Sequence, residues 1–184
     1  LGNFPEAFEL ESKATELDPT SVRFNESLTR IFFFSGDYNK AIIQAEELLE
    51  FDERIFTSYL FVALSYAQLG FFDLAIKNVE KAAETRKSPE TLLNKAYIYG
   101  LSGDYVMAKK LLQEAFQMYA SQFDYADVAL VYMVLKDFEK ALDALEKAFE
   151  ENSTNLILLK VDVRFDKLRG ERRFKELLRK VKLK

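Results

Sequence analysis

The sequence predicts an all-α fold in which pairs of helices stack into a right-handed superhelix. Three repeating features support this prediction: a column of alanines, an aromatic residue three positions before each alanine, and a glycine before most of these aromatics. The alanines are spaced 33 or 34 residues apart, at Ala7, Ala41, Ala75, Ala108 and Ala141. A fixed period of this length is typical of a solenoid built from identical supersecondary units.

The second helix of each pair carries this alanine column. The aromatics three residues before the alanines are Phe4, Tyr38, Phe72, Tyr105 and Phe138, and small or apolar residues follow the alanines by seven positions at Ala14, Leu48, Ala82, Ala115 and Ala148. Spacings of three and seven place these residues on one face of a helix. We therefore expect helices at 3–17, 37–51, 71–86, 104–119 and 137–150.

The first helix of each pair has its own two columns. Small residues recur at Thr29, Ala63, Ala96 and Ala129, and aromatics follow them by three positions at Phe32, Tyr66, Tyr99 and Tyr132. A small residue allows two helices to approach closely, and the aromatic fills the space beside that contact. These columns predict helices at 21–34, 54–68, 89–101 and 122–134.

A glycine followed by a capping residue predicts the turn inside each pair. The glycines are Gly2, Gly36, Gly70 and Gly103, and the expected helix caps are Asn3, Asp37, Asp104 and Asp137. Glycine suits the left-handed conformation just past a helix end, and Asn or Asp accepts a hydrogen bond from the next helix. Two copies depart from the pattern: Phe71 replaces the capping residue, and Lys136 replaces the glycine.

These columns together resemble the tetratricopeptide repeat (TPR), which combines a small residue and an aromatic in its first helix with Gly-x-aromatic-x-x-Ala at its turn. The motif stands here as Gly36-Asp37-Tyr38-Asn39-Lys40-Ala41, and the other copies follow it. We expect a repeat array over 1–152: a half repeat at 1–19, then repeats at about 20–53, 54–87, 88–120 and 121–152. The chain begins without Met and partway through the pattern, so we interpret it as a piece of a longer protein.

After residue 152 the repeat frame stops, and residues 153–184 are predicted to form C-terminal capping helices. A short apolar helix is expected at 155–161, a short helical piece around 165–168, and a final helix at 171–181. In the last of these, Phe174, Leu177, Leu178 and Val181 share one face. A solenoid ends in an element with one apolar and one polar face, because its last repeat would otherwise expose its core.

The tail sequence Leu159–Arg169, followed by Arg173–Leu178, resembles the C-terminal end of repeat regions in bacterial multidomain regulators. In those proteins the repeats follow a CadC-like winged-helix, kinase or cyclase domain. The resemblance implies a scaffolding or regulatory part of a signalling or transcription regulator. Val163 stands where such tails often carry proline.

Composition argues against an enzyme. The chain has 49% hydrophobic and 30% charged residues, which is typical of a folded protein. It contains no Cys and no His, so it lacks a thiol nucleophile, the commonest general base and the commonest transition-metal ligand. Paired carboxylates such as Asp143 and Glu146 fit the polar faces of amphipathic helices. We therefore expect no catalytic, cofactor-binding or metal-binding residue.

The first helices of TPR arrays line a concave face where partners bind, and this resemblance selects the candidate site. The predicted partner-binding residues are Arg30, Phe33, Phe34, Leu60, Leu64, Gln68, Tyr97, Leu101, Leu130, Met133 and Val134. They form a largely apolar groove that suits an amphipathic helix or an extended apolar segment of a protein or peptide. The alternative is that the tail, or tight curvature, fills the same surface. Among these residues only Arg30 is basic. This argues against the site with which some repeat proteins hold a C-terminal carboxylate, because that site uses several Lys, Asn and Arg side chains.

Charge is distributed unevenly along the chain. Residues 1–154 carry 15 Lys and Arg against 26 Asp and Glu, whereas residues 155–184 carry 11 against 4. The basic tail could bind a nucleic acid or an anionic membrane, but it has no aromatic stacking platform and the pI is about 5.1. We interpret it as an outer face attracted to the acidic repeats, with no nucleic-acid contact and no membrane span. A cytoplasmic location is expected, or an extracytoplasmic one if the parent protein is membrane-anchored.

Self-association is the second interpretation of function. The first predicted helix would expose Phe4, Phe8 and Leu17, which pack against a preceding helix in a complete repeat. A second copy of the chain could cover these side chains, so a homodimer is the alternative to a separate peptide ligand.

Overall fold

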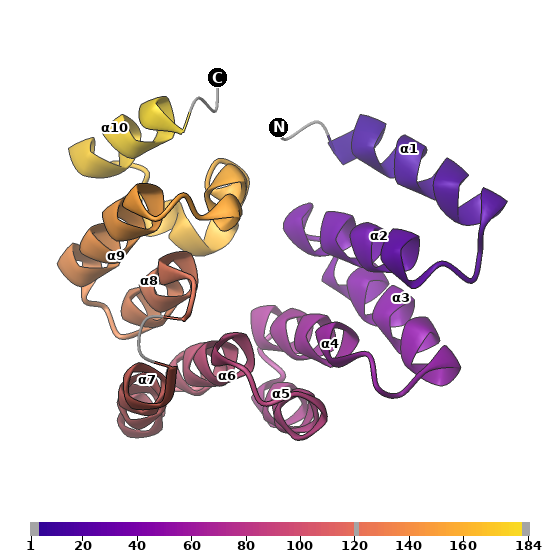
Figure 1. The fold of residues 1–184 in the computed structure, drawn as a ribbon, viewed down its shortest axis with the longest axis horizontal. Helices are drawn as coiled ribbons and strands as arrows, with labels where there is room; N and C mark the ends of the chain where they lie inside the picture. Colours follow the sequence, from indigo (N-terminus) through magenta and orange to yellow (C-terminus); the bar gives the residue numbers. More distant parts are fainter. Residues whose placement is uncertain (1–3, 120–121, 182–184) are drawn as a thin grey trace. The chain divides into compact units, whose positions relative to one another are not determined.

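The computed structural model describes residues 4–119 and 122–181, and its secondary structure is helical throughout that part of the chain (Figure 1). The repeat helices are α1 (Phe4–Leu17), α2 (Val22–Phe34), α3 (Tyr38–Phe51), α4 (Phe56–Gln68), α5 (Phe72–Thr85), α6 (Pro89–Leu101), α7 (Tyr105–Tyr119), α8 (Tyr125–Val134) and α9 (Phe138–Glu150). These bounds agree with the predicted helices to within three residues, so the all-α prediction is confirmed. Gly2 and Asn3 lie outside the described residues.

The chain divides into two compact units, residues 3–91 and residues 92–184. In the first unit, α2 packs on α1 and α3, and α4 packs on α3 and α5. The predicted columns lie at these contacts: Ala41, Ala63 and Ala75 are fully buried, and Thr29 is nearly so. Small side chains at these positions allow neighbouring helices to approach closely.

The second unit repeats the same packing. Ala96, Ala108, Ala129 and Ala141 are fully buried, and α8 packs on α7 and α9. Gly100, on α6, belongs to none of the turn columns. A Cβ atom there would lie 2.4 Å from Cγ2 of Val134, so only glycine lets α6 approach α8 this closely.

The turns inside the pairs have the predicted left-handed residue. Gly36, Gly70 and Gly103 have φ of 86°, 82° and 94°, and Lys136 takes the same position with φ of 61°. Asp104 accepts a hydrogen bond from the Met107 amide at 2.9 Å, as predicted for a cap.

The capping prediction holds for one further aspartate and fails for another. Asp137 accepts a hydrogen bond from the Lys140 amide at 3.3 Å. For Asp37 the prediction is wrong: its side chain caps no amide of α3 among the described residues, and its Oδ2 lies 3.2 Å from Nζ of Lys40. Asp37 has the motif's residue type, but its carboxylate is turned toward the lysine.

Lys136→Gly is expected to stabilise the chain by about 0.5–1 kcal/mol. A residue with a Cβ pays roughly 1–2 kcal/mol in the left-handed region, and the extra flexibility of glycine in the unfolded chain offsets part of that gain. Urea unfolding followed by circular dichroism measures the change. Lys136→Ala is the control, because it also removes the side chain that lies over the Tyr105 ring yet keeps a Cβ. Equal stability of the two variants would contradict the prediction.

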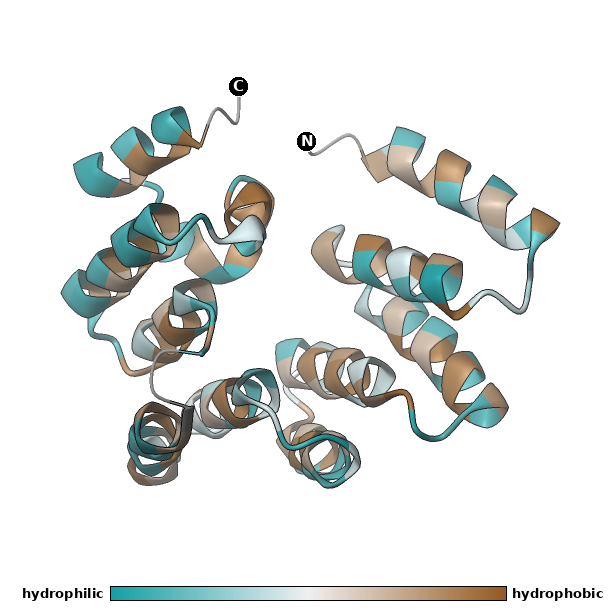
Figure 2. Cartoon of the chain, viewed as in Figure 1, coloured by the Kyte–Doolittle hydropathy of each residue, from teal (hydrophilic) through white to brown (hydrophobic). Residues whose placement is uncertain are grey.

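The tail forms three short elements, η1 (Thr154–Leu158), η2 (Val163–Leu168) and α10 (Arg172–Lys180). The expected apolar helix at 155–161 is corrected here: it is a 3-10 helix that begins one residue earlier and ends three residues earlier. The final helix matches its prediction, with Phe174 and Leu177 buried. Figure 2 shows α10 as a mainly hydrophilic helix, in keeping with a capping element.

No helix in the described parts of the chain combines the length and the apolar character that a bilayer span requires.

Candidate functional site

The eleven predicted partner-binding residues all lie on α2, α4, α6 and α8, the first helices of the pairs, and we call this surface the first-helix face. In the unit of residues 3–91 it comprises Arg30, Phe33 and Phe34 on α2 with Leu60, Leu64 and Gln68 on α4. In the unit of residues 92–184 it comprises Tyr97 and Leu101 on α6 with Leu130, Met133 and Val134 on α8.

Burial divides these residues into two groups. Six are buried, namely Phe33, Leu60, Leu64, Tyr97, Leu130 and Met133. Arg30 is exposed, and Phe34, Gln68, Leu101 and Val134 are half-buried. Five of the predicted residues are therefore at least partly accessible to a partner in this structure, and the chain itself covers the other six.

Phe33 is buried because it is the centre of an aromatic cluster. Its ring centroid lies 5.1 Å from that of Phe34, 5.6 Å from Tyr38 and 5.6 Å from Phe61. The pairs with Phe34 and Phe61 are edge-to-face and the pair with Tyr38 is tilted, and aromatic contacts at these distances stabilise the packing of α2 on α3 and α4. Phe34 keeps part of its ring accessible, and this is the aromatic surface that the first unit presents next to Arg30.

Polar side chains of α2, α4 and α6 lie near Arg30, and the sequence analysis did not identify them. Glu26 on α2 accepts a hydrogen bond from the Thr57 hydroxyl on α4. Burial raises the pKa of Glu90, while the nearby charges of Arg86 and Arg30 act to lower it and Glu26 acts to raise it. The sequence contained one indication of these residues: Thr57 and Glu90 occupy the same position in the repeat, 33 residues apart.

In the second unit the chain's own tail covers part of the first-helix face. The η2 segment packs on α8, and the guanidinium of Arg164 lies 5.8 Å from the ring centroid of Tyr97 on α6. Tail residues Leu159 and Phe165 are themselves buried. The sequence left open whether the first-helix face is an open groove or is filled by the tail. In this unit the tail covers part of it.

Arg164 carries a buried charge in that contact. Its side chain is 9% exposed and that of its partner Asp162 is 4% exposed. Nη2 of Arg164 lies 2.7 Å from Oδ2 of Asp162, and Nε lies 2.8 Å from Oδ1. Burial acts to lower the pKa of Arg164, but Asp162, Tyr97 and Asp127 raise it beyond its ordinary value. The guanidinium is therefore a fixed cation inside the folded unit.

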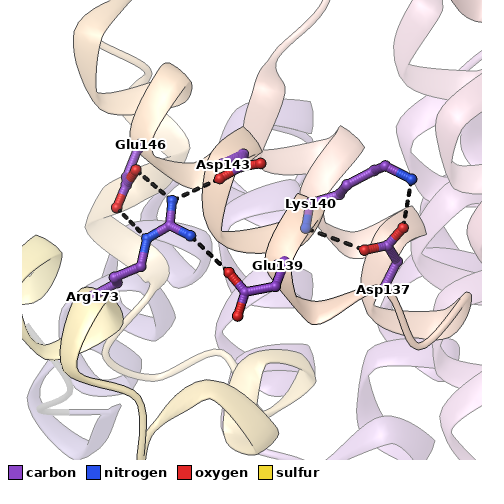
Figure 3. A network of polar contacts seen from close by, with 6 residues as sticks. All are labelled: Asp137, Glu139, Lys140, Asp143, Glu146 and Arg173. Atoms are coloured by element: carbon purple, nitrogen blue, oxygen red, sulfur yellow. Dashed lines mark hydrogen bonds and ion pairs between the residues drawn. The ribbon is translucent and has the colours of Figure 1, made fainter.

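The helix α10 is held by a second arginine (Figure 3). Arg173 donates to Glu146 through Nε at 2.9 Å and Nη2 at 2.6 Å, to Asp143 at 2.7 Å and to Glu139 at 3.0 Å. The expected attraction between the basic tail and the acidic repeats thus has a specific form. Asp143 and Glu146 are more than a solvated face, because they bind this arginine. Within the described residues, no three acidic side chains are placed to hold a metal ion.

Arg173→Gln is expected to destabilise the docking of α10 by about 1 kcal/mol near neutral pH, because several charge-assisted hydrogen bonds are lost from a partly screened site. The hydrogen bond from Arg173 is the main cause that lowers the pKa of Glu146 below its ordinary value of 4.5. The stability that this hydrogen bond contributes is therefore fully present above the ordinary pKa of 4.5. It is lost as the pH falls through the lowered pKa of Glu146.

The measurement is amide hydrogen exchange of residues 172–180 at about pH 6, and urea unfolding from about pH 6 to about pH 3. Arg173→Gln should lose less stability than the wild type over that interval. Arg172→Gln is the matched control, because its side chain is 88% exposed. Equal acid sensitivity in the two variants would show that the Arg173 cluster does not hold α10.

The amino-terminal helix has an accessible apolar surface, as the sequence predicted. Phe8 and Leu17 are exposed, and Phe4 is half-buried. A cavity of about 220 Å³ lies between α1, α2 and the start of α3, and Phe4, Phe8, Ile31 and Phe32 are among its lining residues.

Comparisons with known proteins agree with the repeat architecture. The family model for the tetratricopeptide repeat matches residues 89–122 and 125–155. Among solved structures, TTC0263, a thermophilic TPR protein of Thermus thermophilus, is 19% identical, with 96% of this chain and 91% of that chain covered and a TM-score of 0.69. MamA is 19% identical over 81% of this chain and 92% of its own, with a TM-score of 0.58.

A third solved structure, YrrB, is described as a TPR protein with an unusual peptide-binding site. It is 17% identical over 95% of this chain and 91% of its own, with a TM-score of 0.55. At these identities the structural matches establish a shared fold.

Proposed function

Since the chain carries tetratricopeptide repeats, matched at residues 89–122 and 125–155 and folded as in other TPR solenoids, we propose that it is a scaffold that binds a protein or peptide partner. Repeat arrays of this kind present extended surfaces built from successive first helices. The peptide-binding site described for YrrB supports a peptide as the partner of this fold.

The observation that carries the proposal is that exposed Arg30 and half-buried Phe34 lie one helical turn apart on α2. An accessible cation beside an accessible aromatic edge suits a peptide that places a carboxylate next to an apolar side chain. Gln68 on α4 adds a half-buried amide to the same face. We therefore assign the first-helix face of residues 3–91 as the partner-binding surface.

The test is selection of peptides from a displayed random library on the immobilised chain, followed by titration of the synthetic peptides. Arg30→Glu should weaken binding about tenfold or more, because reversing the charge adds repulsion to the loss of the ion pair. Lys77→Glu is the matched control, since it makes the same charge change on an exposed residue of α5, a second helix. An equal loss of peptide affinity in Arg30→Glu and Lys77→Glu would contradict this assignment. So would peptide binding that neither Arg30→Glu nor Phe34→Ala weakens.

A finer proposal concerns the context of the array. The tail sequence Leu159–Arg169 and Arg173–Leu178 supports a role in the regulatory region of a bacterial multidomain regulator, through its resemblance to such tails. Sequencing the complete reading frame that encodes the chain tests this. A winged-helix, kinase or cyclase domain in the same polypeptide would support the proposal, and a frame without any of them would contradict it.

Self-association is the alternative function, and the accessible apolar surface of α1 favours it. Leu10 and Leu17 are exposed, and so is Phe8, which lines the small cavity together with Phe32. Sedimentation equilibrium at increasing concentration tests it. A dimer that Leu17→Glu dissociates would support this alternative, and a monomer at all concentrations would reject it.

A further inference from the structure

A charged residue lies where a capping segment needs only apolar contacts. The tail already buries Leu156, Leu159, Phe165 and Leu168. Yet Arg164, between these residues in sequence, places its guanidinium against the first-helix face with 9% of its side chain exposed. Burying a cation is unfavourable unless it is paired. Asp162 of the tail supplies the closest counter-charge, and groups of the receiving surface add to it.

Two of those groups belong to the repeats. Tyr97 on α6 presents its ring 5.8 Å from the guanidinium centre, within the range of a cation–π contact. Asp127 on α8 is close enough for its charge to raise the pKa of Arg164. An aromatic face together with a carboxylate is the combination that recognises a planar guanidinium.

We propose that Tyr97 and Asp127 form an arginine-binding site on the first-helix face of residues 92–184. The chain's own Arg164 occupies it, and an arginine of a peptide partner can take its place. This inference rests on the proposed function, that the chain binds a peptide partner, and it treats the first-helix face of residues 92–184 as a second peptide-binding surface. It adds a ligand chemistry and a form of regulation: the tail competes with the partner.

The connection of the tail is compatible with such an exchange. The segment leaves α9 through a short turn in which Asn152 has φ of 57°, a left-handed conformation that Asn adopts readily just past a helix end. From there η1 and η2 are 3-10 helices, whose hydrogen bonds are poorer than those of an α-helix. Beside Arg164, Val163 is exposed and Phe165 is buried with its ring centroid 6.3 Å from that of Phe174 on α10, so Arg164 is the residue that this segment turns toward Tyr97.

The test uses the full chain with Arg164→Ala and a fluorescent peptide of residues 158–169. A second peptide has alanine in place of its arginine. The variant removes the tail's arginine from the site and so weakens the docking of this segment. The arginine peptide should therefore displace the segment and bind about tenfold more tightly than to the wild-type chain, and more tightly than the alanine peptide does. Adding Asp127→Asn to the variant should remove that difference. Lys167→Ala is the matched control, because it removes an exposed cation from the same segment and should bind like the wild type.

Circular dichroism shows whether Arg164→Ala is folded. If it is folded and binds both peptides equally, or neither, the proposal is overturned. If it is not folded, hydrogen exchange of the chain with Asp127→Asn alone decides. Amides of residues 162–169 should exchange about fivefold or more faster than in the wild type, with residues 4–91 unchanged, and no change would overturn the proposal. Peptide binding that Arg30→Glu leaves unchanged would refute the proposed function while leaving this result untouched, so the two failures are distinguishable.

Discussion

Replacing Asp162 with alanine is expected to lower the free energy of unfolding by about 3 kcal/mol, because it leaves the buried Arg164 guanidinium without its closest counter-charge. This loss lies at the lower end of the range for breaking a buried ion pair, because the charge of Asp127 still acts on Arg164. The substitution also removes the oxygen that accepts a hydrogen bond from the Arg164 amide at the start of η2, at 3.0 Å. Urea unfolding measures the change.

Asp166→Ala is the matched control for this variant. Asp166 lies on the same segment and pairs with Arg169 at 2.6 Å, but its side chain is 56% exposed. Its removal should cost about 1 kcal/mol or less, as for most surface ion pairs. Asp162→Ala combined with Arg164→Leu should recover part of the lost stability, because no unpaired buried charge remains. Equal effects of the two aspartate variants, or no recovery in the double variant, would contradict this account.

Phe174→Ala is expected to be the other strongly destabilising change, by about 3–5 kcal/mol. Phe174 is fully buried on α10, and its ring centroid lies 6.3 Å from that of Phe165 on η2. Truncation removes an aromatic side chain from the contact that joins the last two elements of the tail, and it leaves a cavity there. Thermal unfolding gives the size of the effect, and hydrogen exchange should show the greatest increase within residues 163–180.

Phe138→Ala provides the comparison, because Phe138 starts α9 and remains 36% exposed. It should cost roughly 1 kcal/mol, in proportion to the smaller apolar area that it buries. Phe174→Leu should fall between these two variants, since leucine refills most of the space. If Phe174→Ala were no worse than Phe138→Ala, the tail would not be an integral part of the second unit.

Much of the repeat architecture could be predicted from local pattern. The alanine and aromatic columns placed every repeat helix, because helix amphipathicity is a property of spacing along the chain. The glycine column identified the left-handed turns, and Lys136 takes that conformation even though the glycine is missing there. Asp37 shows the limit of such reasoning: it has the right residue type at the right position, but its carboxylate contacts Lys40.

The candidate site was less predictable. Position in the repeat placed all eleven residues on the first helices, but it could not separate buried Phe33 from half-buried Phe34. That separation depends on Tyr38 and Phe61, which belong to other helices. Likewise, the charged residues of the tail include both Arg164 and Arg173, yet one is buried against Tyr97 and the other binds carboxylates of α9.

The sequence by itself determined the helices, the period and the all-α class, because these follow from interactions within a few residues along the chain. Only the tertiary structure decided which residues are accessible, since burial depends on elements distant in sequence. The need for glycine at position 100 comes from Val134 on another helix. The occupancy of the second unit's first-helix face comes from a tail segment that begins more than fifty residues after Tyr97. Periodicity locates a surface, and long-range packing decides whether that surface is open.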